Sequence, residues 1–316
     1  MRSLKDYASI TLKGLAMGAA DVVPGVSGGT IAFITGIYEE LINSINKINL
    51  EALSILRKEG LGKAWNYING WFFVSLFLGI AISIISLAKG ITYLLDTHPT
   101  LLWSFFFGLV FASIFFVAKG VKKWKLSTVV GLVIGAAFAY YITTLPAQTE
   151  NEALWYIFIS GMIAICAMIL PGISGSFILL LMGSYKVVLT AIHERNLLTI
   201  ATFAVGAVIG LLSFSRLLKW MFAKHHDVTI AVLSGFLVGS LNKIWPWKET
   251  LSTFTKHAGE PNEEIVPVEQ VSILPQRFEE LYNTPSQLGP AIGLFLTGAA
   301  IIAIMEWASR RKPQND

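Results

Sequence analysis

Charged side chains are scarce in this chain, and their scarcity argues against an ordinary soluble domain. They make up 14% of the 316 residues, whereas hydrophobic residues make up 54%. A soluble domain carries about 25% charged residues. Several uncharged stretches approach the roughly 20 residues that an α-helix needs to cross a bilayer core. The composition therefore predicts an all-α polytopic membrane protein.

The chain also lacks the residue sets that most metal sites and hydrolytic enzymes need. Cys166 is the one cysteine, which excludes an internal disulfide and a cysteine-based metal cluster. His98 and His225 have no acidic or histidine partner at ligand spacing, so we expect no metal. No nucleophile–base pair or HExxH motif is present. We expect a non-enzyme with no cofactor and no nucleic-acid partner.

The apolar segments fall into two groups of three predicted spans, each preceded by a longer segment. The spans are 70–88, 100–118 and 126–145, then 197–215, 228–246 and 287–308. Segments 8–42 and 153–190 would each form a helix of about 50 Å, which is too long for one span. Each has a Pro-Gly pair near its middle. Two half-length helices in a re-entrant hairpin fit these segments better.

The distribution of basic residues predicts the orientation. They gather at both termini and in the loops at 119–125 and 216–227, as Arg2, Lys5, Lys13, Lys119, Lys122, Lys123, Lys125, Arg216, Lys219, Lys224, Arg310, Arg311 and Lys312. The positive-inside rule places these regions in the cytoplasm. The first hairpin then enters from the cytoplasmic face and the second from the outer face. The acidic connection at 146–153 and the polar loop at 247–286 are expected outside, the latter as a cap.

The two halves of the chain resemble each other. "PGVSGGTIAFITGIY" aligns with "PGISGSFILLLMGSY" at an offset of 147 residues, and the following spans align at an offset of 127. Each half, 1–146 and 147–316, has one hairpin and three spans. Because three is odd, the halves should have opposite orientations. This predicts an inverted-topology repeat, which is common in secondary transporters.

The repeated motif has the composition of a broken helix inside a membrane. Pro24 and Pro171 end a helix, and the glycines allow a sharp turn. Ser27 and Ser174 are N-cap residues for a new helix, whose N-terminus attracts an anion such as phosphate. The predicted phosphate-binding residues are Ser27, Gly28, Gly29, Thr30, Ser174, Gly175 and Ser176. The alternative is a packing break, in which the serines satisfy only the backbone.

Four charged residues have two interpretations each. Asp21 lies at membrane depth, where it could carry a coupling proton or cation, or fix the hairpin through backbone N–H groups. Glu39 is either a second coupling residue or an interfacial one. Lys89 and Arg216 occupy matching positions at predicted helix ends. They either attract phosphate or extend to the lipid headgroups.

The motifs "GAADVVPGVSGGTIAFITGIYEELI" and "LPGISGSFILLLMGSY" resemble those of the bacterial polyprenyl-phosphate transporter family, of the PopT type. The resemblance covers nearly the whole chain. It implies a flippase that returns the lipid carrier undecaprenyl phosphate across the cytoplasmic (inner) membrane for peptidoglycan and surface-polymer synthesis. Its partners would be undecaprenyl phosphate and membrane lipids. Whether a second copy of the chain is also a partner, in a homodimer, is left open. The residues alone also allow a small inorganic anion transporter or channel, or an intramembrane lipid phosphatase.

Overall fold

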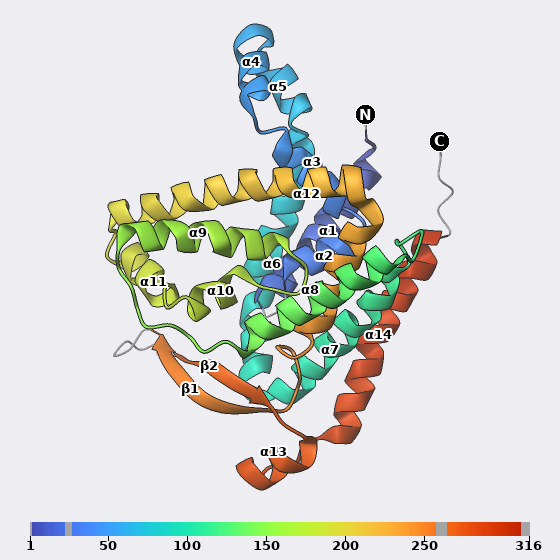
Figure 1. The fold of residues 1–316 in the computed structure, drawn as a ribbon, viewed down its shortest axis with the longest axis vertical. Coiled ribbons are helices and arrows are strands. Elements are labelled where there is room, and N and C mark those ends of the chain that lie inside the picture. The colour runs from blue at the N-terminus through green and yellow to red at the C-terminus, as the bar shows by residue number, and fades with distance from the viewer. Residues whose placement is uncertain (1, 23–26, 257–263, 311–316) are drawn as a thin grey trace.

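The computed structural model describes residues 2–22, 27–256 and 264–310. Within these ranges the chain is helical apart from one two-stranded antiparallel sheet (Figure 1). Five of the described helices are long and apolar enough to cross a membrane, or six if one bent pair counts as a single span. The predicted class of helical polytopic membrane protein is confirmed, and the small sheet is an addition to it.

Each predicted hairpin consists of three helices rather than two. The first half contains α1 Leu4–Val22, α2 Gly28–Ile34, α3 Tyr38–Asn46, α4 Leu50–Glu59, α5 Leu61–Tyr67, α6 Gly70–Thr97, α7 Pro99–Ala118 and α8 Leu126–Thr144. The second contains α9 Leu154–Ile169, α10 Gly175–Leu181, α11 Tyr185–His193, α12 Leu197–Ser240, β1 Lys248–Lys256, β2 Glu264–Ser272, α13 Pro275–Tyr282 and α14 Leu288–Arg310. The third helix of each hairpin follows a glycine with positive φ, and the bend between α10 and α11 is 105°.

The expected loop at 216–227 is helical. The segment belongs to α12, Leu197–Ser240, whose 44 residues form two helices that meet at a kink at His225, where the backbone is not helical. A straight helix of that length would measure about 66 Å, roughly twice a bilayer core. No proline or glycine lies between 216 and 227, so no residue there forces the helix to end. The last part of α12 stops at Ser240, well before the predicted span end at 246.

The two halves have matching backbone features at the positions that the sequence alignment pairs. Helices α2 and α10 have seven residues each, and α3 and α11 have nine each. Gly36 and Gly183, at the bends, have φ of 73° and 66°. His98 and His225 have φ, ψ of −138°, 51° and −136°, 47°. The sequence similarity therefore extends to the breaks between helices.

The last helix of each half packs on the other half. Helix α14 lies against α7, and α8 lies against the last part of α12. Glycines permit both crossings: a Cβ at Gly108 would strike the carbonyl oxygen of Phe295, and one at Gly235 would strike that of Leu132. The two halves are thus interlocked, because the last helix of each packs against a helix of the other.

The region expected as a cap forms the sheet and α13. Trp245 and Trp247 anchor its two ends, since their indole N–H groups donate to the carbonyl oxygens of Ile273 and Ser286, each at 2.9 Å. Figure 1 shows β1, β2 and α13 on the lower side of the view, whereas α1 begins and α14 ends on the upper side. The cap and the helix ends nearest the termini therefore lie on opposite faces.

Candidate functional site

The two repeated motifs meet inside the protein. The Ser27 hydroxyl donates to the carbonyl oxygens of Met168 and Leu170, at 3.2 and 3.4 Å. The Gly172 N–H donates to Thr30 Oγ1 at 2.9 Å. Ser27 and Thr30 are fully buried. The hydroxyls of the first motif thus satisfy backbone groups that the helix break leaves unpaired in the second.

The N–H groups at the start of α2 are satisfied from within the chain. Gly28 N–H donates to Asp21 Oδ1 at 2.6 Å, and Gly29 N–H donates to Ser27 Oγ at 3.1 Å. In this conformation, the anion at this helix start is the carboxylate of Asp21. The predicted break residues Pro24 and Gly25 lie outside the described residues. The second interpretation of Asp21, that it fixes the hairpin, agrees with this geometry.

The second motif opens toward solvent instead. The Ser174 hydroxyl accepts a hydrogen bond from Phe177 N–H at 3.2 Å and lies 3.3 Å from the hydroxyl of Ser176. Ser174 and Gly175 are buried or half-buried, whereas Ser176 is exposed. Ser176 and Phe177 line a cavity. The two copies of the motif therefore have different surroundings.

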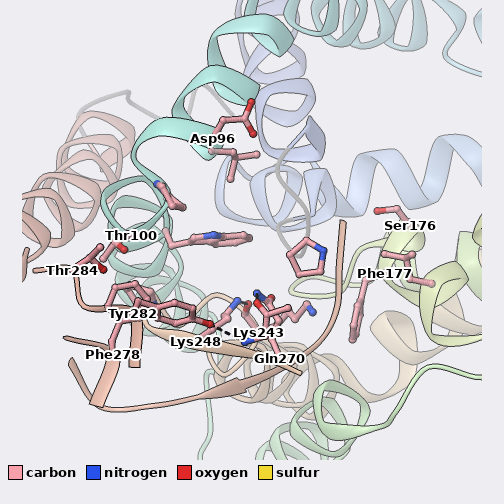
Figure 2. Close-up of a pocket in the computed structure, with 17 residues that line it drawn as sticks. Asp96, Thr100, Ser176, Phe177, Lys243, Lys248, Gln270, Phe278, Tyr282 and Thr284 are labelled. Atoms are coloured by element: carbon pink, nitrogen blue, oxygen red, sulfur yellow. Dashed lines mark hydrogen bonds between the residues drawn. The ribbon is translucent and has the colours of Figure 1, made fainter. Parts of the chain in front are cut away.

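This cavity lies between the membrane helices and the cap (Figure 2). Its volume is about 590 Å³, within the usual range for a small-molecule site. It is lined by the end of α6, the start of α7, α10, the turn after α12, both strands and α13. The cavity is thus closed on one side by the hairpin motif of the second half and on the other by the cap.

Two lysines occupy the lining of this cavity. Figure 2 shows Lys243 and Lys248 together, and the Lys248 ammonium donates to the carbonyl oxygen of Lys243. The Lys243 ammonium lies 4.4 Å from the ring centre of Phe177, and that of Lys248 lies 4.5 Å from the ring centre of Trp103. Lys248 is only 8% exposed. Across the described residues, no ion pair joins either lysine to a carboxylate.

Burial changes the protonation of both lysines. It lowers the pKa of Lys243 to about 8. Burial, together with the neighbouring charge of Lys243, also lowers the pKa of Lys248. The cause is that an apolar surrounding disfavours the charged ammonium. An anion in the cavity would favour the protonated form of both side chains.

The comparisons with known proteins identify the family. Residues 17–262 match the model of the VCA0040-like family, described as undecaprenyl phosphate translocase-like. The chain belongs to this family. It is 50% identical over 301 residues to a polyprenyl-phosphate transporter of Vibrio cholerae, covering 95% of this chain and 96% of that one. A polyprenyl-phosphate transporter of Staphylococcus aureus is 33% identical over 254 residues, covering 74% and 85%. No solved structure matches the chain.

In this VCA0040-like protein the other predicted site residues lie away from the cavity. Glu39 is half exposed, and its Oε1 is 3.4 Å from Nε2 of His226. Lys89 and Arg216 are exposed. The expectation that they end helices is wrong, because α6 continues to Thr97 and α12 continues past Arg216 as far as the kink at His225.

Sequence reasoning missed Lys243 and Lys248. Neither lies in the repeated motif, and their partners Trp103 and Phe177 are distant in the chain. A signal was present in "KIWPWK", residues 243–248, where two lysines flank two tryptophans just after an apolar segment. Aromatic rings next to lysines at a membrane boundary are also typical of interfacial anchors. The cavity, which both lysines line, favours a ligand-binding role for them over that of interfacial anchors.

Proposed function

We propose that this protein translocates undecaprenyl phosphate across the bacterial cytoplasmic membrane and so returns the lipid carrier for peptidoglycan and surface-polymer synthesis. Two relatives named as polyprenyl-phosphate transporters support this function, one of them along nearly the full length of both chains. The candidate membrane spans agree with it. The role is transport rather than catalysis.

The observation that carries the proposal is the contact between the two broken-helix motifs. Non-helical backbone at membrane depth is tolerated where it is buried in protein or lines a wet cavity. In many transporters, broken helices from two repeats meet at the substrate site. Here, Ser27 and Thr30 of one motif bond to the backbone of the other. The matching bends and kinks support an inverted repeat as the basis of this arrangement.

The phosphate-binding role of the motif residues is part of the proposal. Ser174, Gly175 and Ser176 adjoin the cavity and could receive a phosphate in this conformation. A phosphate at Ser27, Gly28, Gly29 and Thr30 would need the Asp21 carboxylate to release Gly28 and the two motifs to separate. Replacement of the Asp21 carboxylate by a phosphate at this helix start would couple binding of the lipid headgroup to movement of the two motifs. Lys89 and Arg216 would attract the headgroup along the lipid-facing surface.

The proposed orientation keeps both termini in the cytoplasm and the cap outside. Figure 1 supports it, since the start of α1 and the end of α14 lie on the face opposite the cap. An external cap would cover the face from which the used carrier returns. A proton or cation that drives the cycle, with Asp21 or Glu39 as its carrier, and a homodimer both belong to the proposal.

Vesicles that contain the purified protein and undecaprenyl phosphate test the function. A soluble phosphatase added outside cleaves the headgroups of the outer leaflet only. With the protein present, the inner-leaflet pool should also become accessible, and a proton gradient should change the rate if protons drive the cycle. A pool that stays protected under all gradients would contradict the proposal.

Two control measurements separate the alternatives. Uptake of inorganic phosphate without any movement of the lipid would favour a small-anion transporter. Release of phosphate from the lipid without added phosphatase would show an intramembrane lipid phosphatase. Neither is expected.

A further inference from the structure

The cavity under the cap has a charge that its own lining does not balance. Two ammonium groups face it, and Asp96 is the one acidic side chain among its lining residues. No ion pair between Asp96 and either lysine is found in the described parts of the chain. Burying a charge is costly unless it is paired. An anionic ligand would offset this cost and favour the protonated form of both lysines, so the site favours an anion.

The two lysines line the same cavity from adjoining segments. The Lys248 ammonium bonds to the backbone carbonyl of Lys243, so the start of β1 is joined to the short turn after α12. Their aromatic neighbours, Phe177 and Trp103, lie on different helices, α10 and α7. The two lysines thus lie between two walls of the cavity. A phosphate monoester has three terminal oxygens and close to two negative charges at neutral pH.

We propose that this cavity is a binding site for a phosphate monoester, with Lys243 and Lys248 holding its oxygens. The inference rests on the proposed function for the identity of the ligand as a polyprenyl phosphate, but the site itself is argued from this chain's residues. Ser176, exposed at the start of α10, lies in the same lining and offers a hydroxyl. The site would receive the headgroup on the cap side, before it passes to the meeting point of the two motifs.

The apolar part of the lining fits the first isoprene units of such a lipid. Trp103, Phe177, Leu180 and Phe278 supply aromatic and aliphatic surface beside the lysines. A volume of about 590 Å³ holds a headgroup and a short prenyl segment, whereas a long tail would have to remain in the membrane. The same cations would bind free phosphate, but without this apolar contact the affinity should be lower.

Calorimetric titration of the full chain in detergent tests the site. The probes are geranyl phosphate, inorganic phosphate and geraniol, which lacks the phosphate. Wild type should bind geranyl phosphate more tightly than the other two. Lys243→Gln should weaken geranyl phosphate binding roughly tenfold to a hundredfold, because a charge-assisted hydrogen bond is lost. Lys243→Arg should restore most of it, and Lys58→Gln, on the exposed helix α4, should have no effect.

A second variant avoids the risk that loss of a buried lysine disturbs the fold. Gln270, on β2 in the cavity lining, changes little in shape when replaced by Glu. Gln270→Glu adds a negative charge and should weaken geranyl phosphate binding while geraniol binding stays the same. Asn66→Asp is the matched control, since it adds the same charge at an exposed position of α5, on the side of the molecule opposite the cap (Figure 1). Thermal unfolding of each variant verifies its fold.

The outcomes separate the site from the function. Folded Lys243→Gln and Gln270→Glu variants that bind geranyl phosphate like wild type would overturn the site and leave translocation untouched. Binding that depends on the lysines, in a protein that fails to move undecaprenyl phosphate, would support the site and contradict the proposed function. Equal affinity for inorganic phosphate and geranyl phosphate would overturn the assignment of the apolar wall to a lipid.

Discussion

At the scale of single residues, Asp21 shows how a charge at membrane depth can be structural. The sequence left two roles open for it, coupling or fixing the hairpin. The structure places its carboxylate 2.6 Å from the N–H of Gly28, at the first turn of α2. Its repeat partner is Met168, whose carbonyl oxygen accepts from Ser27. The two equivalent positions thus make different contacts: Asp21 bonds within its own hairpin, whereas Met168 bonds to the motif of the other half.

We expect Asp21→Asn to fold like wild type, since the amide oxygen can still accept from Gly28 N–H, but to lose the response of transport to a proton gradient if Asp21 is the proton carrier. Asp21→Ala removes the acceptor and should reduce stability by about 0.5–2 kcal/mol, as for the loss of other helix-start acceptors. Thermal unfolding and vesicle transport measure the two effects. A stable Asn variant that transports like wild type under all gradients would show instead that the carboxylate only fixes the hairpin.

The buried lysines predict a pH dependence of anion binding. The pKa of Lys243 is lowered to about 8, so its ammonium is present below that pH and is lost as the pH rises through it. The affinity for geranyl phosphate should therefore fall between pH 7 and pH 9, by up to about tenfold per unit above the pKa. A guanidinium stays charged in this range, so Lys243→Arg should show a smaller fall. Titrations at both pH values test this, and an unchanged wild-type affinity would contradict it.

At the scale of elements, the sequence predicted the half-helices well because their signals are local. Proline, glycine and serine mark the break, and α9 ends at Ile169, just before Pro171. The second bend of each hairpin was missed, although Gly36 and Gly183 were aligned as repeat partners. Their positive φ depends on the backbone around them, which residue type alone does not reveal. The kink at His225 lies inside the loop predicted at 216–227, but no residue type there marks its exact position.

The repeat-related glycines predict unequal effects of the same substitution. Alanine at either position is strained by about 1–2 kcal/mol, because both have left-handed φ. A Cβ at Gly36 would meet no atom within 4 Å, whereas one at Gly183 would lie 2.5 and 2.6 Å from the carbonyl oxygens of Thr149 and Gln148. Gly183→Ala should therefore lower the thermal unfolding midpoint more than Gly36→Ala. Equal shifts of the unfolding midpoint would show that the backbone at Thr149 can move aside without loss of stability.

At the scale of the whole molecule, the sequence did not predict that the last helix of each half packs against the other half. The alignment divided the chain at residue 146, which suggests two self-contained halves. Yet α8 packs on α12 and α14 packs on α7. Helix pairing between apolar surfaces has no complementary signal that a single sequence reveals, because any small-residue face can fit several partners. The cavity also joins the two halves, since α7 of the first half and α10 of the second form its walls.

The orientation of the whole molecule gives the last prediction, and the single cysteine makes it testable. With Cys166→Ser as the background, Lys122→Cys and Ser252→Cys each place one thiol at an exposed position, before α8 and on β1 respectively. The lysine-rich loop should face the cytoplasm, and the cap should face outward. In intact cells, a membrane-impermeant maleimide should label residue 252 and leave residue 122 unlabelled until the cells are opened. Labelling of both positions from outside would refute the orientation, and with it the odd number of spans per half on which the inverted repeat depends.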